Sequence, residues 1–242
     1  MNSAYFKNEA KKDLQGKWQT FSMAVIFNCV IFLFVFIRSV TSIIFLLAND
    51  LELFEIPLFF NGLSEFFSND IVSILFDVVS FFIASPLVYA MSVMALKVAN
   101  NKEIEFNNIY DGFRNYKSVI VLCFVENIYI MLWTLLFIIP GIVKGISYSM
   151  SYFIMAEHPD MTATEILKES ERLMQGHKWE YCMLMLDFSG WILLSVVTLD
   201  LSSIYSSPYL YTAQAEFYQY IKHYKNSRAD FADSVEGQAA AE

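Results

Sequence analysis

Three ionisable side chains lie inside long apolar segments of this 242-residue chain: Glu126, Lys144 and Asp187. Glu126 and Asp187 each stand nine residues after a lysine that ends a polar connection, Lys117 and Lys178. At 1.5 Å per residue both carboxylates lie about 13 Å beyond that lysine, at the same height. Two facing carboxyl groups can share a proton or hold a cation, because burial and a like charge both disfavour ionisation. These residues are therefore a candidate intramembrane polar site for proton or cation movement.

A purely structural interpretation of the same three residues stays open. Lys144 comes from the opposite end of its segment, thirteen residues before Glu157, and its side chain can reach toward either acid. Charged groups inside a membrane usually pair with one another. Lys144 and one acid would then form a buried pair that only fixes helix packing.

The apolar segments that carry these residues are long enough to cross a hydrocarbon layer of about 30 Å. The chain is 56 % hydrophobic and only 17 % charged. We therefore predict an all-α fold, a transmembrane bundle of six helices in one membrane domain over 1–225, followed by a disordered tail over 226–242. The predicted spans are approximately 18–48, 70–99, 118–139, 141–157, 179–199 and 203–222.

The basic residues predict the orientation of these spans. Fourteen of the sixteen lysines and arginines fall in every second connection or in the two terminal segments, whereas the outer connection over 50–70 is acidic. The positive-inside rule places such basic connections in the cytoplasm. Both termini are therefore expected inside, in a multi-pass protein of the cytoplasmic (plasma) membrane. The fourteen residues are Lys7, Lys11, Lys12, Lys17, Lys97, Lys102, Arg114, Lys117, Lys168, Arg172, Lys178, Lys222, Lys225 and Arg228.

A repeat underlies the arrangement, because a short segment with helical apolar periodicity precedes each odd-numbered span. Leu14-Gln15-Gly16-Lys17-Trp18 resembles Met174-Gln175-Gly176-His177-Lys178-Trp179, with a glycine placed to end a helix. Ser85-Pro86 and Ser207-Pro208 also correspond. This pattern indicates three units, each a cytoplasmic amphipathic helix followed by a transmembrane hairpin. The alternative is that any cytoplasmic linker lying on lipid headgroups looks amphipathic.

Two further groups of residues favour structural roles. Arg38 and Asp77 each lie twenty or more residues from the cytoplasmic lysine of their span, Lys17 and Lys97 respectively. We therefore predict that they form an ion pair at the outer rim between the first two spans. Gly141, Gly145 and Ser149 recur every four residues and form a helix-packing stripe that lets another backbone approach closely. A short, interrupted helix of this kind also lines cavities in some transporters.

The sequence contains no recognisable enzyme motif: no paired-histidine zinc motif, no phosphate-binding glycine loop and no glycine-flanked serine. The cysteines Cys29, Cys123 and Cys182 fall inside predicted spans and have no zinc-binding spacing. We therefore expect no catalytic residue, no metal and no cofactor.

Several segments resemble one known family. They are Phe137 to Lys144, Tyr148 to Met150, Ala156 to Pro159, Ser170 to Trp179, Gly190 to Leu194, Pro208-Tyr209 and the opening Ala10 to Trp18. Together they are similar to a bacterial family of six-span membrane proteins called domain of unknown function 975. The resemblance implies a bacterial cytoplasmic membrane protein, and it supplies no catalytic or binding residue.

Three function classes follow. The first is a non-enzymatic membrane scaffold or accessory subunit that acts through helix contacts and through its basic face against anionic lipid. The alternative is a small transporter or permease that uses Glu126, Asp187 and Lys144, and the third class is a membrane enzyme. The expected partners are the lipid bilayer and another membrane protein or a second copy of the chain, and not nucleic acid.

Overall fold

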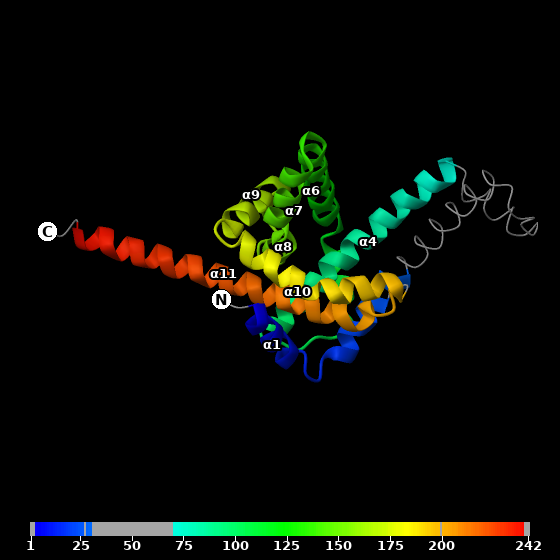
Figure 1. The fold of residues 1–242 in the computed structure, drawn as a ribbon, viewed down its shortest axis with the longest axis horizontal. Coiled ribbons are helices and arrows are strands. Elements are labelled where there is room, and N and C mark those ends of the chain that lie inside the picture. Colours follow the sequence, from blue (N-terminus) through cyan, green and yellow to red (C-terminus); the bar gives the residue numbers. More distant parts are fainter. Residues whose placement is uncertain (1–2, 27, 31–69, 199, 240–242) are drawn as a thin grey trace, which may run out of the picture.

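The computed structural model describes residues 3–26, 28–30, 70–198 and 200–239, and all regular elements within these ranges are helices. The predicted all-helical fold is confirmed. Residues 18–26 and 28–30 are also helical. The helices, labelled in Figure 1 except for α5, are α1 (Ser3–Asp13), α4 (Asp70–Ala99), α5 (Asn108–Arg114), α6 (Tyr116–Leu136), α7 (Ile138–Tyr148), α8 (Ser151–Glu157), α9 (Ala163–Met174), α10 (Lys178–Val197) and α11 (Ser203–Ala239).

Four described segments are long and apolar enough to cross a membrane: Ile74–Ala99, Tyr116–Leu136, Ile138–Glu157 and Lys178–Val197. They coincide with the second to fifth predicted spans, so the sequence and the fold agree on a membrane protein. Most of the first predicted span, 18–48, lies outside the described residues. The sixth lies in α11, which is not among the four because serine, tyrosine, glutamine and glutamate reduce its apolar character.

The C-terminal segment is helical in this structure. Helix α11 continues to Ala239 and its end projects beyond the other helices in Figure 1, whereas the sequence predicts disorder from residue 226 on. Alanine, which recurs in this segment, is the best helix former. A helix that is already nucleated also gains one hydrogen bond for each residue it adds, so propagation needs no tertiary contact.

The hydrophobic core occupies one half of the spans, the half next to the basic connections. In α4 the side chains of Leu87, Met94 and Val98 are buried, whereas those of Ile74 and Ile83 are exposed. The same division occurs in α6 and α10, where the buried positions lie in the first half of each helix. The core therefore ends partway along the spans.

Two of the three predicted amphipathic helices complete this core, whereas most of the apolar side chains of α5 are exposed. Phe6, Ala10 and Leu14 are buried beneath α1, and Ile166 and Met174 are buried beneath α9. Other helices, rather than lipid headgroups alone, cover these apolar faces. This observation supports the repeat over the alternative of linkers that merely lie on the membrane.

The glycines that end two of these helices adopt the same backbone conformation. Gly16 has φ +79° and Gly176 has φ +87°. Both values lie in the left-handed region, which a glycine enters without the steric penalty of a Cβ. The sequence repeat therefore encodes a repeated turn between an amphipathic helix and the span that follows it.

The three amphipathic helices each pack against the second half of another unit. Helix α5 packs against α4, α9 packs against α7 and α8, and α1 packs against α11. Helices α4, α7–α8 and α11 are the second spans of the first, second and third units. The second unit thus contacts the first, the third contacts the second, and the first contacts the third. Small buried residues lie in these helices at matching positions, Ala10 in α1, Gly112 in α5 and Ser170 in α9. A Cβ on Gly112 would lie 2.8 Å from the Cβ of Ala90 in α4, so this contact requires glycine.

Candidate functional site

The three predicted intramembrane charges do not form a common ion-pair network. Lys144 Nζ lies 2.7 Å from Glu171 Oε1, so α7 is joined to α9 rather than to the helix of either predicted acid. Asp187 is exposed on α10, whereas Glu126 lies mostly inside the bundle on α6. Counting residues gives the height of a side chain along its helix, but it does not give the direction in which that side chain points.

The surroundings of Lys144 match the structural interpretation. The ammonium lies 5.3 Å from the ring centroid of Trp133 and 5.7 Å from that of Tyr148. Such cation–π contacts add to the ion pair with Glu171. Together these groups line a cavity of about 250 Å³ that also reaches Lys168. Glu171 was missed because α9 was expected to face the cytoplasm, where a glutamate needs no partner.

A helix break lies beside this pair. Helix α7 ends at Tyr148 and α8 begins at Ser151, so the predicted short fourth span is interrupted. The Ser170 hydroxyl donates to the carbonyl of Ser147 at 2.8 Å and accepts from the Met150 N–H at 3.3 Å. Backbone groups freed by the break must find partners inside a membrane. A serine of the amphipathic helix α9 therefore stabilises the interruption.

Glu126 lies in a cluster of polar side chains near the same break. Within the described part of the chain, its Oε2 atom is buried and has no hydrogen-bond partner. The carboxyl interacts electrostatically with Tyr152 of α8 and Tyr181 of α10. The amide of Gln214 in α11 donates to the Tyr181 hydroxyl at 3.0 Å. Residues of α8 and α10 thus lie near the Glu126 carboxyl group of α6, and a buried carboxyl group without a hydrogen-bond partner among the described residues can hold a proton.

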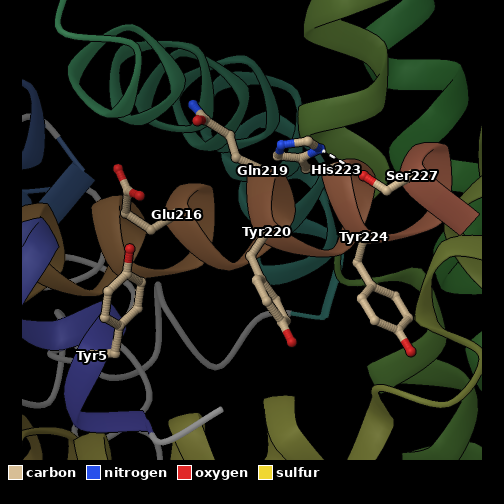
Figure 2. Close-up of a pocket in the computed structure, with 7 residues that line it drawn as sticks. All are labelled: Tyr5, Glu216, Gln219, Tyr220, His223, Tyr224 and Ser227. Atoms are coloured by element: carbon tan, nitrogen blue, oxygen red, sulfur yellow. Dashed lines mark hydrogen bonds between the residues drawn. The ribbon is translucent and has the colours of Figure 1, made fainter.

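A second polar cavity, of about 440 Å³, lies along α11 and α1 (Figure 2). The Oε1 atom of Glu216 and the Nε2 atom of Gln219 are both buried without a hydrogen-bond partner among the described residues. The carboxyl group of Asp13 in α1 lies near that of Glu216. His223 Nδ1 lies 3.3 Å from Ser227 Oγ. Sequence reasoning did not use the spacing of Glu216, Gln219 and His223, which places the three residues on one side of a helix.

The small-residue stripe of α7 divides into two environments. A Cβ on Gly141 would lie 2.8 Å from the Cα of Thr134, so this glycine permits the close α6–α7 hairpin. A Cβ on Gly145 would have no heavy atom within 4 Å among the described residues. The Ser149 hydroxyl donates to the Ile146 carbonyl at 2.8 Å at the helix break. Gly141 is therefore packed against another helix of the chain, and no described residue covers Gly145.

The remaining predicted site residues have simpler outcomes. The Arg38–Asp77 pair stays a prediction, because Arg38 lies outside the described residues; Asp77 is on the exposed half of α4. The described residues contain no group of three or more histidine, cysteine, aspartate or glutamate side chains that could hold a metal ion.

Comparison with known proteins gives a family match over part of the chain and no activity. Residues 137–225 match the family model described as a protein of unknown function, DUF975. The predicted resemblance to DUF975 is confirmed. The DUF975 segment begins at the start of α7 and ends within α11, so it includes the helix break, Ser170 and the cavity residues Glu216 to Tyr224. No curated protein and no solved structure matches the chain.

Proposed function

We propose that this protein is a bacterial membrane scaffold or accessory subunit without enzymatic activity. It would cross the cytoplasmic membrane six times, with both termini inside. The alternating basic connections and the four apolar helices support this arrangement. The basic connections would face anionic lipid in the inner leaflet, where each exposed lysine or arginine adds about 1 kcal/mol of attraction.

The proposal rests on the contacts that the residues of the predicted polar site make. Lys144 pairs with Glu171, and Ser170 bonds the broken backbone, so these polar groups serve helix packing. Gly145, by contrast, leaves open space on α7. In membranes, small residues allow a second helix to approach closely. A membrane helix of a partner protein, packed over Gly145, is therefore the expected contact.

The test is gentle extraction from native membranes, followed by mass determination of the intact complex. A stoichiometric second protein that is lost from the Gly145→Leu variant supports the scaffold role. The matched control is Ile142→Leu, one turn away on α7, which changes shape but not volume at an exposed apolar position. A lone chain, or a complex unchanged by Gly145→Leu, would contradict the proposed contact.

Transport is the second candidate function, and the Glu126 cluster favours it. A buried carboxyl beside an interrupted helix is a common arrangement in membrane transporters. If the protein moves protons or cations, Glu126→Gln should abolish flux in proteoliposomes while thermal stability stays near that of the parent. Asp187→Asn is the matched control, because Asp187 is exposed. Equal loss of folding without a flux defect in the folded fraction would assign Glu126 to structure.

A further inference from the structure

The cavity around Lys144 is lined mainly by groups that donate hydrogen bonds. Its volume is about 250 Å³, and its walls belong to α6, α7 and α9. Lysine ammonium groups and the tryptophan N–H only donate, and tyrosine and threonine hydroxyls can donate as well. A ligand with several acceptor oxygens therefore suits this cavity. The lining residues are Tyr129, Trp133, Lys144, Tyr148, Thr164, Leu167, Lys168 and Glu171.

Two lysines and one glutamate give this cavity a net positive charge. Lys144 Nζ lies 2.7 Å from Glu171 Oε1, so these two charges compensate each other. Lys168 is exposed on α9 and forms no ion pair with another described residue. One positive charge therefore remains, and it matches the negative charge of a phosphodiester. Lysine is also a common phosphate-binding residue, because it acts as a point charge.

The other acidic side chains of α9 are engaged elsewhere. Glu165 accepts hydrogen bonds from the backbone N–H and the hydroxyl of Thr162, at 2.9 Å and 2.7 Å. The two carboxylate oxygens of Glu169 accept from Arg172 at 2.6 Å and 2.7 Å. Lys168 lies one turn after Glu165 and interacts with it electrostatically, without a direct ion pair. These contacts leave the ammonium of Lys168 available to a ligand.

The polar walls of the cavity are accessible. The side chains of Lys144 and Glu171 are 21 % and 34 % exposed. Trp133 and Tyr129 are 38 % and 40 % exposed, and Lys168 is exposed as well. A ligand that enters the cavity can therefore contact groups from all three helices without first displacing a buried side chain.

An exposed apolar surface continues from the cavity along α6. Leu132 and Leu136 stand three residues after Tyr129 and Trp133, so they lie on the same side of the helix. Both leucines are exposed. Tryptophan and tyrosine are enriched at the depth of lipid headgroups. The acyl chains of a phospholipid can therefore lie along this surface while its phosphate lies in the cavity.

We propose that the cavity between α6, α7 and α9 binds a phosphate group, with Lys144 and Lys168 as its cationic contacts. The phosphate belongs either to a phospholipid headgroup or to free inorganic phosphate, and the apolar surface of α6 favours the lipid. This binding site goes beyond the proposed scaffold role and does not depend on a partner helix at Gly145.

The first test is calorimetric titration of the full-length protein in a nonionic detergent with three probes. They are phosphatidylglycerol, a diacylglycerol with the same acyl chains, and inorganic phosphate. We expect phosphatidylglycerol to bind at least about tenfold more tightly than diacylglycerol, a difference of about 1.4 kcal/mol. Equal binding of these two lipids, or no binding of either phosphate compound, would overturn the proposal.

The same titrations identify the source of the phosphate. Inorganic phosphate that binds more weakly than phosphatidylglycerol assigns the site to the lipid, because the acyl chains then contribute to binding. Inorganic phosphate that binds as tightly as phosphatidylglycerol assigns the site to the free anion.

Three variants locate the site. Lys168→Gln should weaken phosphatidylglycerol binding at least about tenfold, because it removes the uncompensated charge. Its thermal unfolding should match that of the parent, since Lys168 is exposed. Lys168→Arg keeps the charge and should retain most of the binding. Lys117→Gln, the matched control at an exposed position of α6 outside the cavity, should leave binding unchanged. Equal losses in Lys168→Gln and Lys117→Gln would indicate nonspecific attraction to surface charge and overturn the site.

Discussion

The two halves of the spans have similar apolar composition but different surroundings. In the half near the basic connections, the side chains of Met94, Leu122 and Leu184 are fully buried against other helices. In the other half, Leu135 is 81 % exposed and Val197 is 80 % exposed among the described residues. Lipid tails are as apolar as leucine, so apolar character alone does not draw helices together in a bilayer. Packing therefore requires features that only one half has.

Those features are small residues and paired polar groups. The packed half contains the amphipathic helices, the Gly112 contact and the hydrogen bonds of Ser170. It also contains the pair of Glu157 and Lys222, to which the Tyr218 hydroxyl donates at 2.6 Å. Polar contacts of this kind hold the packed half together and leave the exposed half available to lipid or to a partner helix.

The largest expected effect comes from the centre of the packed half. Phe217 is fully buried and its ring contacts those of Phe6 and Tyr181. Phe217→Ala should lower the free energy of unfolding by about 3–5 kcal/mol, because a cavity remains. Phe124→Ala, at an exposed position of α6, should change it by less than about 0.5 kcal/mol. Denaturant unfolding in micelles, followed by circular dichroism, measures both; similar losses would contradict the division into two halves.

Two glycines of α7 give a sharper comparison within one helix. Gly141→Ala should lower stability by about 1–3 kcal/mol, because the new methyl group is forced against Thr134. Gly145→Ala should be neutral or stabilising by up to about 1 kcal/mol, since alanine favours the helix and the space is open. Thermal unfolding of the two variants side by side tests this difference, and a reversed order would show that the hairpin contact is wrong.

The smallest expected effect is at the start of α9. Thr162 and Glu165 form a capping box there. Thr162→Ala should cost about 1 kcal/mol. Thr164→Ala, two residues on and exposed, is the matched control. A loss as large in Thr164→Ala, measured by denaturant unfolding, would remove the special role of the cap.

The same cap predicts a pH dependence. Hydrogen bonds from the Thr162 side chain and backbone lower the pKa of Glu165 below its ordinary value. A carboxyl with a lowered pKa in the folded state stabilises the protein above its unfolded pKa, and this contribution is lost as pH falls through the folded value. The stability difference between the parent and Glu165→Gln should therefore shrink on acidification. A stability difference between the two proteins that stays constant from neutral to acidic pH would contradict this role of the Glu165 carboxylate.

Sequence reasoning predicted the elements well and the site poorly. The second to fifth spans coincide with described helices, and Gly16 and Gly176 end α1 and α9 with the same left-handed turn. These features follow from local rules of length, periodicity and glycine geometry. The structure pairs Lys144 with Glu171, an acid that neither alternative named.

The sequence by itself determined where the second to fifth spans lie and at what height along its helix each polar residue stands. Those properties depend on residues within a few turns of one another, at a fixed rise per residue. Only the tertiary structure decided that α9 supplies Glu171 and Ser170 to α7, that Asp187 faces outward, and that Glu216 meets Asp13 beside a cavity. The rotation of a helix about its axis, and the choice of its neighbours, depend on all the helices packing at once.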